Sequence, residues 1–342
     1  LTSPLRRPRR DTFAEVVRAR LGPTVAREFY DPYIRKLWDA DPDDLSGELA
    51  RRRVSASSPA DVARRLLRGR TPEGRSFLYP RRGFGQVSEA LADAAVEEGA
   101  DVRLSTAVEG VRIHDDGNGV ALTLADGSVI EAAMAWSTVP LPALVGMADP
   151  APPADVAAAA AVLRHRALLL VYLVLDRSHY TEFDAHYFPG LDVPMARLSE
   201  PRNYRHDPDA PPSTTVLCAE VPCWEGDDHW NASPDDLAAL VADGLARAGL
   251  PPVGPVAVEI RRLPRVYPVY RPGFEADVAA VQAWEDAQPA LVSFGRQGLF
   301  VPDNTHHALA MGTAAAACLG DRFDDAAWRA ARDGFAAHVV ED

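Results

Sequence analysis

The chain has 342 residues, a hydrophobic content of 47% and a formal net charge of −13. This length can bury one large core or two medium ones. The negative charge argues against a nucleic-acid partner, because phosphate binding depends on clustered basic side chains. The longest apolar run, residues 167–175, is about half of what a membrane-spanning helix requires. The three cysteines form no Cys-x-x-Cys pair, which favours reduced thiols and a cytoplasmic protein without a membrane span.

Residues 11–75 show the apolar spacing that is typical of helices. Asp11 is placed to cap the first helix, and Gly22-Pro23 is a strong stop signal. The pattern predicts helices over residues 12–21, 24–38, 46–53 and 59–67. We therefore expect a helical segment at the start of the chain.

The middle of the chain combines two predicted helices with many strands. Alternating apolar residues on both sides of the polar turn at 115–119 predict a hairpin, with a helix before it at 86–98. Residues 162–270 alternate strands with loops around one helix at 234–248. The β-branched run at 167–175 indicates a central strand.

The last part of the chain has the most informative pattern. Residues 293–304 predict a buried strand, a glycine turn and an asparagine, and a long helix is expected to begin near Met311. Gly312 and the small residues 313–317 leave the first turns of that helix without bulk. Free N–H groups and the positive end of a helix dipole favour an electron-rich, partly anionic ligand. A closing helix is predicted over residues 324–339.

This arrangement resembles the C-terminal flavin-binding segment of the flavin amine oxidase superfamily, especially its protoporphyrinogen oxidase-like and UDP-galactopyranose mutase-like branch. Two further blocks carry the resemblance. One is Tyr-Pro-Arg-Arg-Gly-Phe-Gly at residues 79–85, followed by the helix and by a strand at 99–104; the other is Ser-Thr-Val-Pro-Leu-Pro at 137–142. The first block departs from the family at Arg82, where a glycine is common.

The resemblance implies an α/β fold with two domains (α+β). An incomplete FAD/NAD(P)-binding Rossmann-like domain would be interleaved with a substrate domain of mixed sheet and helices. The expected segments are the helical part of the substrate domain at 11–75, an FAD-domain segment at 76–145, the mixed-sheet substrate domain at 146–285 and a C-terminal FAD-domain segment at 286–342. The implied FAD contacts are Gly295, Arg296, Asn304, Met311 and Gly312, with Val108 at the adenine.

One expected motif is absent from the chain. Folds of this type hold the FAD diphosphate on a Gly-x-Gly-x-x-Gly turn between the first strand and helix. Gly83-x-Gly85 is followed by Ser88 instead of a third glycine, and Gly117-x-Gly119 has no helix behind it. We therefore expect this chain to be the C-terminal part of a longer flavoprotein, with the turn upstream or on a second polypeptide, and to hold FAD poorly alone.

Two residues are candidates for contact with substrate. No nucleophile-elbow, zinc or paired-carboxylate signature is present, which agrees with a flavin supplying the redox chemistry. Arg197 is the first choice for a substrate anion or a flavin carbonyl; the alternative is an ion pair with Glu220. Tyr267 resembles a family tyrosine near the flavin face; the alternative is core packing.

Two other sites receive structural interpretations. Lys36 can be likened to the lysine near the flavin of amine oxidases, but a position on the surface or at a helix end is favoured. His306-His307 lacks a convincing third ligand, so no metal is expected. The pair is interpreted as lining a loop beside the flavin, or as capping or surface residues.

Three functions remain open from the sequence. The leading hypothesis is an FAD-dependent oxidoreductase that takes a hydride from a small-molecule substrate. The second is a mutase-like isomerase acting on a nucleotide sugar, for which Arg197 and Arg202 are the available cations. The third is a truncated flavoprotein without catalytic activity.

Overall fold

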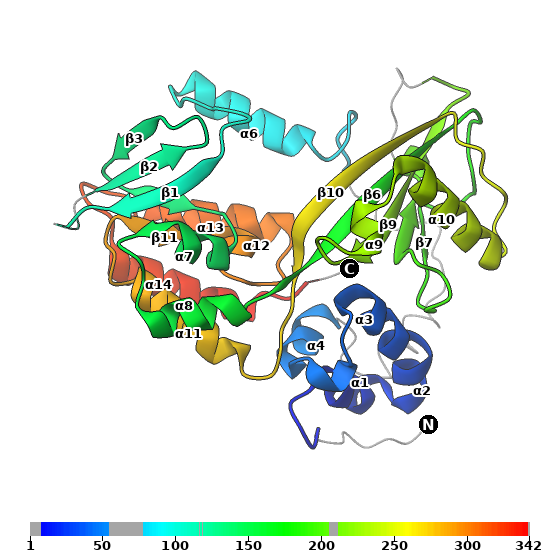
Figure 1. Ribbon diagram of the computed structural model, residues 1–342, viewed down its shortest axis with the longest axis horizontal. Helices are drawn as coiled ribbons and strands as arrows, with labels where there is room; N and C mark the ends of the chain where they lie inside the picture. Colours follow the sequence, from blue (N-terminus) through cyan, green and yellow to red (C-terminus); the bar gives the residue numbers. More distant parts are fainter. Residues whose placement is uncertain (1–7, 55–77, 116, 118, 205–210, 341–342) are drawn as a thin grey trace.

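The computed structural model describes residues 8–54, 78–115, 117, 119–204 and 211–340. The described chain combines helices with one five-stranded, one four-stranded and one two-stranded sheet. Figure 1 shows the helical N-terminal unit below the five-stranded sheet, and the two smaller sheets with the C-terminal helices at the other end. The α/β fold class expected from the sequence is confirmed.

Short helices form the N-terminal unit: α1 Phe13–Leu21, α2 Pro23–Val25, the π-helical turn η1 Ala26–Tyr30, α3 Asp31–Trp38, the 3₁₀ turn η2 Pro42–Asp44 and α4 Gly47–Arg53. The single helix expected over residues 24–38 is therefore divided by a π turn, which ends just before Pro32, a residue without an N–H for the helical ladder. Thr12, not Asp11, caps α1 by accepting the Glu15 N–H at 3.4 Å. The helix predicted at 59–67 lies outside the described residues.

The five-stranded sheet has the order β10-β6-β9-β8-β7. Its strands are β6 His165–Leu175, β7 Ala185–Tyr187, β8 Arg197–Ser199, β9 Thr215–Cys223 and β10 Ala257–Pro268. All the described ladders in this sheet are antiparallel. The prediction of a central strand is confirmed, because β6 lies between β10 and β9. Helix α10 Pro234–Arg247 packs Leu237, Val241 and Leu245 into the core of this sheet, and the short α9 Asp228–Asn231 precedes it.

The other end of the molecule contains two smaller sheets. The four-stranded sheet has the order β3-β2-β1-β5, and the parallel pair β11-β4 forms the other. The strands are β1 Val108–Ile113, β2 Val120–Leu124, β3 Val129–Ala132, β4 Ala135–Ser137, β5 Ala148–Asp149 and β11 Leu291–Ser293. The predicted hairpin is confirmed as β1–β2. Residues 101–104, expected to be a strand, form none; Leu104 is 84% exposed.

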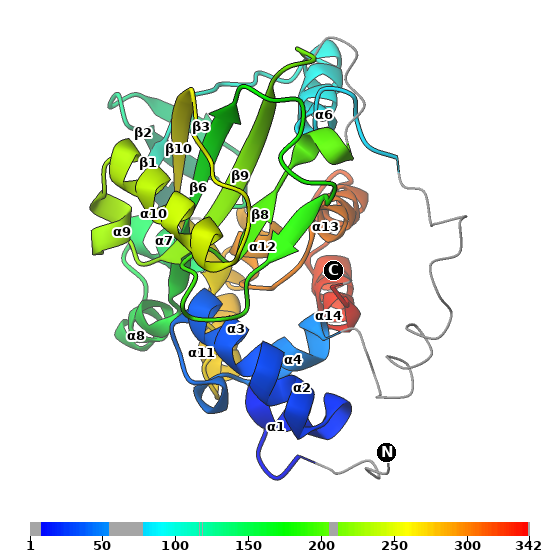
Figure 2. The same ribbon diagram turned by 90° about the vertical axis from the view of Figure 1, so that its right-hand side faces the viewer.

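The helices at this end are α6 Gln86–Glu97, α7 Leu141–Met147, α8 Ala154–Val162, α11 Phe274–Glu285, α12 Gly295–Gly298, α13 Thr305–Ala317 and α14 Asp325–Gly334, with the 3₁₀ turn η4 Phe335–Ala337. Figure 2 shows the five-stranded sheet above α1–α4, with α13 and α14 beside it. Helices α7, α8 and α11 share a hydrophobic core with the N-terminal unit. Segments distant in sequence therefore pack together.

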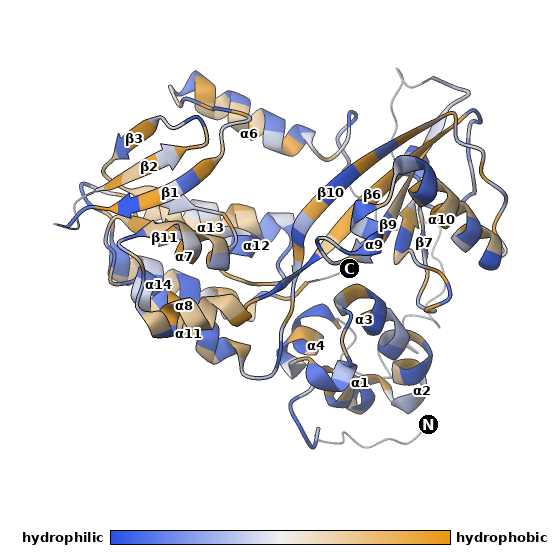
Figure 3. Cartoon of the chain, in the orientation of Figure 1, coloured by the Kyte–Doolittle hydropathy of each residue, from blue (hydrophilic) through white to orange (hydrophobic). Residues whose placement is uncertain are grey.

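Helix α6 differs from the rest of the described helices of comparable length. None of its residues is buried, and Figure 3 shows apolar positions along its surface. Leu91 and Val96 are each 52% exposed. Among the described residues, α6 thus leaves apolar side chains exposed, and such patches are common at sites of contact.

Candidate flavin site

The strand and glycine turn predicted near residue 295 are present. Strand β11 runs parallel to β4, and the Phe294 N–H donates to the Ser137 carbonyl at 3.0 Å. Gly295 follows with φ +80°, a conformation that glycine adopts without strain. At Gly298, a Cβ would lie 3.1 Å from the Ser137 carbonyl oxygen. The glycine therefore allows the backbone of α12 to approach the end of β4.

Helix α13 begins earlier than predicted. It starts at Thr305 with Asn304 as its N-cap, two turns before Met311. The Asn304 N–H donates to His307 Nδ1 at 3.2 Å. His307 therefore has the capping role considered for it, and His306, which lies beside it, is exposed. The helix start was predicted near Met311 because of the small residues that follow it. The sequence also holds a helix-start signal further upstream: Asn304 is followed three residues later by His307, whose side chain can accept a hydrogen bond.

A cavity of about 670 Å³ opens at the N-terminus of α13. This volume suits a cofactor or substrate of moderate size. The cavity is lined by two of the three segments that carried the family resemblance. Phe84 and Val87 come from the block at residues 79–85 and the helix after it, and Arg296 and Asn304 come from the C-terminal segment. The other lining residues are Asp303, Thr305, His306, Ala308 and Leu309.

Arg296 gives this site positive charge. Its guanidinium donates to the Val266 carbonyl at 3.0 Å and the Asp303 carbonyl at 3.4 Å, and lies 5.7 Å from the Tyr267 ring centroid. Burial lowers the pKa of Arg296, and the nearby Arg53 adds to this effect. No carboxylate forms an ion pair with either arginine within the described residues. Because unneutralised buried cations are costly, the site favours an anionic or electron-rich ligand.

Tyr267 lies between aromatic and cationic groups. Its ring centroid is 5.6 Å from that of Trp38, and Arg53 lies 5.7 Å from the Tyr267 ring. Burial raises the pKa of its hydroxyl, so it stays neutral. These contacts describe a packed residue at the edge of the cation-rich site, and its role toward flavin stays a prediction.

Arg197 is neutralised within the chain. Its Nε donates to Glu220 Oε1 at 2.9 Å, and the two residues are paired across β8 and β9. The second candidate cation, Arg202, donates to the carbonyls of Pro211 and Thr214. The ion-pair alternative for Arg197 is thus the observed arrangement, whereas Arg202 donates to backbone carbonyls, which do not cancel its charge.

Lys36 lies in the last turn of α3, the helix-end position that was favoured, but its side chain is half-buried. Its ammonium donates to the carbonyl of Phe188 and, at 2.9 Å, to that of Met195. Burial lowers its pKa to about 8. Lys36 therefore joins α3 to the loop before β8, a tertiary contact that a local pattern cannot reveal.

The other predicted cofactor contacts are placed as follows. Met311 is fully buried, whereas Gly312 is half-buried and a Cβ there would meet only the Phe294 ring, at 3.7 Å. Val108 is half-buried at the first position of β1, beside an irregularity in the ladder. The structure brings Gly295, Arg296 and Asn304 together, while Val108 lies on the four-stranded sheet.

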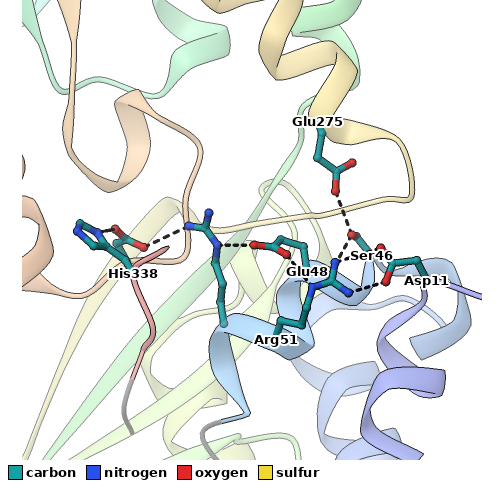
Figure 4. A network of polar contacts seen from close by, with 8 residues as sticks. Asp11, Ser46, Glu48, Arg51, Glu275 and His338 are labelled. Atoms are coloured by element: carbon teal, nitrogen blue, oxygen red, sulfur yellow. Dashed lines mark hydrogen bonds and ion pairs between the residues drawn. The ribbon is translucent and has the colours of Figure 1, made fainter. Parts of the chain in front are cut away.

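The histidine pair does have potential metal ligands nearby. Ligand atoms of Asp303, His307 and His338 lie within 4.8 Å of one another. The sequence offered no convincing third ligand for His306-His307, because His338 comes from the C-terminal segment, far away in the sequence. The expectation that no metal binds here stays a prediction. Figure 4 shows His338 at one end of a polar network that reaches Asp11 and Glu275.

A family model described as flavin containing amine oxidoreductase matches residues 4–319. Among the curated proteins, none matches this chain. No helix in the described part of the chain is long and apolar enough to cross a membrane.

Several solved flavoenzyme structures share the fold. A reduced UDP-galactopyranose mutase is similar with a TM-score of 0.76 and 20% identity, over 100% of this chain and 74% of that one. A putative protoporphyrinogen oxidase from Exiguobacterium sp. 255-15 has a TM-score of 0.62 and 21% identity, over 86% and 64%. Cyclohexylamine oxidase from Brevibacterium oxydans IH-35A has a TM-score of 0.57 and 18% identity, over 84% and 62%. The chain thus spans about three quarters of the mutase and less than two thirds of each oxidase.

Proposed function

Because the chain belongs to the flavin containing amine oxidoreductase family and has FAD as its cofactor, we propose that it is the C-terminal part of an oxidoreductase that removes a hydride from a small-molecule substrate. The observation that carries the proposal is the cavity where Arg296 meets the N-terminus of α13. A bound flavin supplies the hydride acceptor in this chemistry.

The residues at this cavity fit an electron-rich flavin edge. Arg296 contributes a positive charge without an ion-pair partner in the described chain, and Asn304 places the free N–H groups of α13 at the cavity wall. Gly295 allows the sharp turn between β11 and α12. We assign these three residues to flavin binding. Apolar Phe84, Val87 and Leu309 would exclude water from the same cavity.

Arg197 receives a supporting role in this proposal. Its pair with Glu220 stabilises the register between β8 and β9, on the sheet that would face the substrate. Tyr267 would form a wall of the substrate space, held in place by Trp38 and two arginines. Neither residue needs to exchange a proton during hydride removal.

We also propose that the diphosphate of FAD is held by a βαβ unit outside this sequence, upstream or on a second polypeptide. The uncovered face of α6 and exposed Leu309, on opposite sides of the cavity, support this arrangement. The chain itself carries no Gly-x-Gly-x-x-Gly turn. The unit would complete the cavity and cover α6.

The visible absorption spectrum of the purified chain, before and after FAD addition and desalting, tests the proposal. Flavin bands near roughly 375 and 450 nm mark bound cofactor. Bleaching of the 450 nm band by a primary amine under nitrogen would identify an amine oxidase. If the chain never perturbs the spectrum of added FAD, the flavin assignment is wrong.

The isomerase hypothesis keeps one supporting observation, the fold similarity to a mutase over the whole chain. Of its expected cations, Arg197 is paired with Glu220, and Arg202 donates to backbone carbonyls that leave its charge in place. Activity on a nucleotide sugar that requires reduced flavin and consumes no acceptor would favour it. Flavin binding without either activity would favour the non-catalytic fragment.

A further inference from the structure

A buried cluster of metal-binding side chains lies beside the flavin cavity. Asp303 is 0% exposed and His307 is buried, both near the start of α13, whereas His338 belongs to the segment after η4. Asp303 Oδ2 and His338 Nδ1 are 2.6 Å apart, and a ligand atom of His307 lies within 4.8 Å of both. Three donors from two distant segments therefore surround one point.

Asp303 has unused capacity for a cation. Its Oδ1 atom is buried and accepts no hydrogen bond from the described residues. Arg52 Nη1 lies 3.6 Å from this atom, but the Nε of Arg52 is donated to Glu48 at 2.8 Å. Asp303 and Glu48 share the Arg52 guanidinium, and Glu48 has a second ion pair, with Arg51 Nε at 2.9 Å, whereas the long contact to Arg52 is the one arginine ion pair of Asp303 among the described residues.

We propose that Asp303, His307 and His338 bind a divalent first-row transition ion, with zinc as the best match. Two imidazoles and one carboxylate, with a fourth position open to water, form a common zinc ligand set. A tetrahedral zinc about 2.0–2.1 Å from each ligand holds neighbouring donor atoms about 3.3 Å apart. Zinc binding would therefore move Asp303 Oδ2 and His338 Nδ1 slightly apart and bring the ligand atom of His307 closer to both.

Two local changes accompany binding. The rings of His307 and His338 are stacked at 4.4 Å and 15°, so one ring must turn for both lone pairs to point at the ion. His307 Nδ1 now accepts the Asn304 N–H. Coordination through either ring nitrogen ends this bond, because the Nδ1 lone pair goes to the ion or the ring proton moves to Nδ1 so that Nε2 can coordinate. Coordination through His338 Nδ1 also requires this nitrogen to carry no proton, so it can no longer donate to Asp303.

The site would fasten the C-terminal segment to the wall of the flavin cavity. The Val340 N–H already donates to the Arg52 carbonyl at 3.0 Å, and Arg52 contacts Asp303. A metal bound to His338 and Asp303 would therefore join three parts of the chain: α4, the start of α13 and the C-terminal segment. Asn304, at the cavity wall, lies next to one of the ligands.

Zinc titration of the chelator-treated, flavin-free chain tests this site directly. We expect one bound equivalent in the wild-type chain, measured by calorimetry and by metal analysis after desalting. His307→Gln and His338→Gln should each weaken zinc binding by at least about 10–100-fold, as loss of a ligand or its supporting shell does. His306→Gln is the matched control, because this exposed neighbour is outside the cluster; it should bind like wild type.

Cobalt supplies a second readout, which reports the coordination geometry; circular dichroism of each variant shows that it is folded. A tetrahedral cobalt complex gives intense visible absorption, which we expect from the wild type and His306→Gln and not from His338→Gln. Absence of stoichiometric zinc binding to the wild type would overturn the proposal. Equal binding by all three histidine variants would overturn it as well. Because no flavin is present, failure here leaves the proposed flavin function untouched.

Discussion

The five-stranded sheet buries its apolar side chains, whereas helix α6 leaves its apolar side chains exposed. Leu169, Val171 and Leu173 on β6 are each 0% exposed, enclosed by neighbouring strands and by α10. Helix α6 buries no residue, and Leu91 is 52% exposed. Apolar surface that stays in water contributes nothing to stability. The apolar side chains of the sheet are thus buried within this chain, whereas those of α6 stay exposed in it.

The largest expected effect separates these two regions. Leu169→Ala should lower the free energy of unfolding by about 2–5 kcal/mol, because it leaves a cavity in a packed core. Leu91→Ala on α6 should change it by less than about 0.5 kcal/mol, as exposed substitutions do. Urea denaturation of both variants makes the comparison. A large loss in Leu91→Ala would mean that α6 is covered in solution.

Glu285 gives the flavin end a pH-dependent stability. Burial raises its pKa from 4.5 to about 7, so the folded state holds a proton that the unfolded state releases near pH 4.5. The contribution of Glu285 to the free energy of unfolding should therefore fall as pH rises from about 4.5 to 7, by up to about 3 kcal/mol at 1.36 kcal/mol per pKa unit. Glu285→Gln should remove this fall and be more stable than wild type at pH 8. If the free energy of unfolding changes with pH in the same way in the wild type and in Glu285→Gln, this account of Glu285 is wrong.

Arg197→Met tests whether Arg197 is structural. It leaves the largely buried Glu220 carboxylate without its partner and should cost about 1.5 kcal/mol. Arg197→Met combined with Glu220→Gln should recover part of this loss, as a double-mutant cycle measures. Flavin binding should not change. If the Arg197→Met variant has a tenfold higher Kd for flavin and unchanged stability, Arg197 contributes to flavin binding and the structural account is wrong.

The smallest effect is expected at the start of α13. Asn304→Ala removes the N-cap residue and should cost about 1 kcal/mol. Thr305→Ala, at the exposed first residue of the helix, is the control and should cost less. Thermal unfolding of the two variants would show the difference. Equal melting temperatures would mean that the cap contributes nothing.

Local patterns predicted much of the fold. The apolar, β-branched run at 167–175 predicted the central strand, and the polar turn at 115–119 between alternating residues predicted the hairpin, because each signal depends on neighbouring residues. The strand expected at 99–104 did not form, although its residues suit one; in the described chain no neighbouring strand pairs with it. The π turn that divides residues 24–38 also escaped the pattern, since it depends on how α3 packs.

The candidate site was predicted in part. Gly295, Arg296 and Asn304 come from one short segment, so their proximity could be inferred from sequence. The pairing of Arg197 with Glu220 was one of two open alternatives, and only strand register decided it. The contacts of Lys36 and His338 join segments separated by more than 30 residues. No local spacing encodes such contacts.

Flavin binding by this chain alone tests the central claim most directly. Titration of riboflavin and FAD, followed by flavin fluorescence, should give weak but saturable binding, with similar affinities because the diphosphate turn is absent. Arg296→Met should weaken both by at least about tenfold. Arg262→Met, which like Arg296 loses donors to two carbonyls but lies on the five-stranded sheet, should bind like wild type. No saturable binding, or equal binding by Arg296→Met, would contradict the flavin site described above.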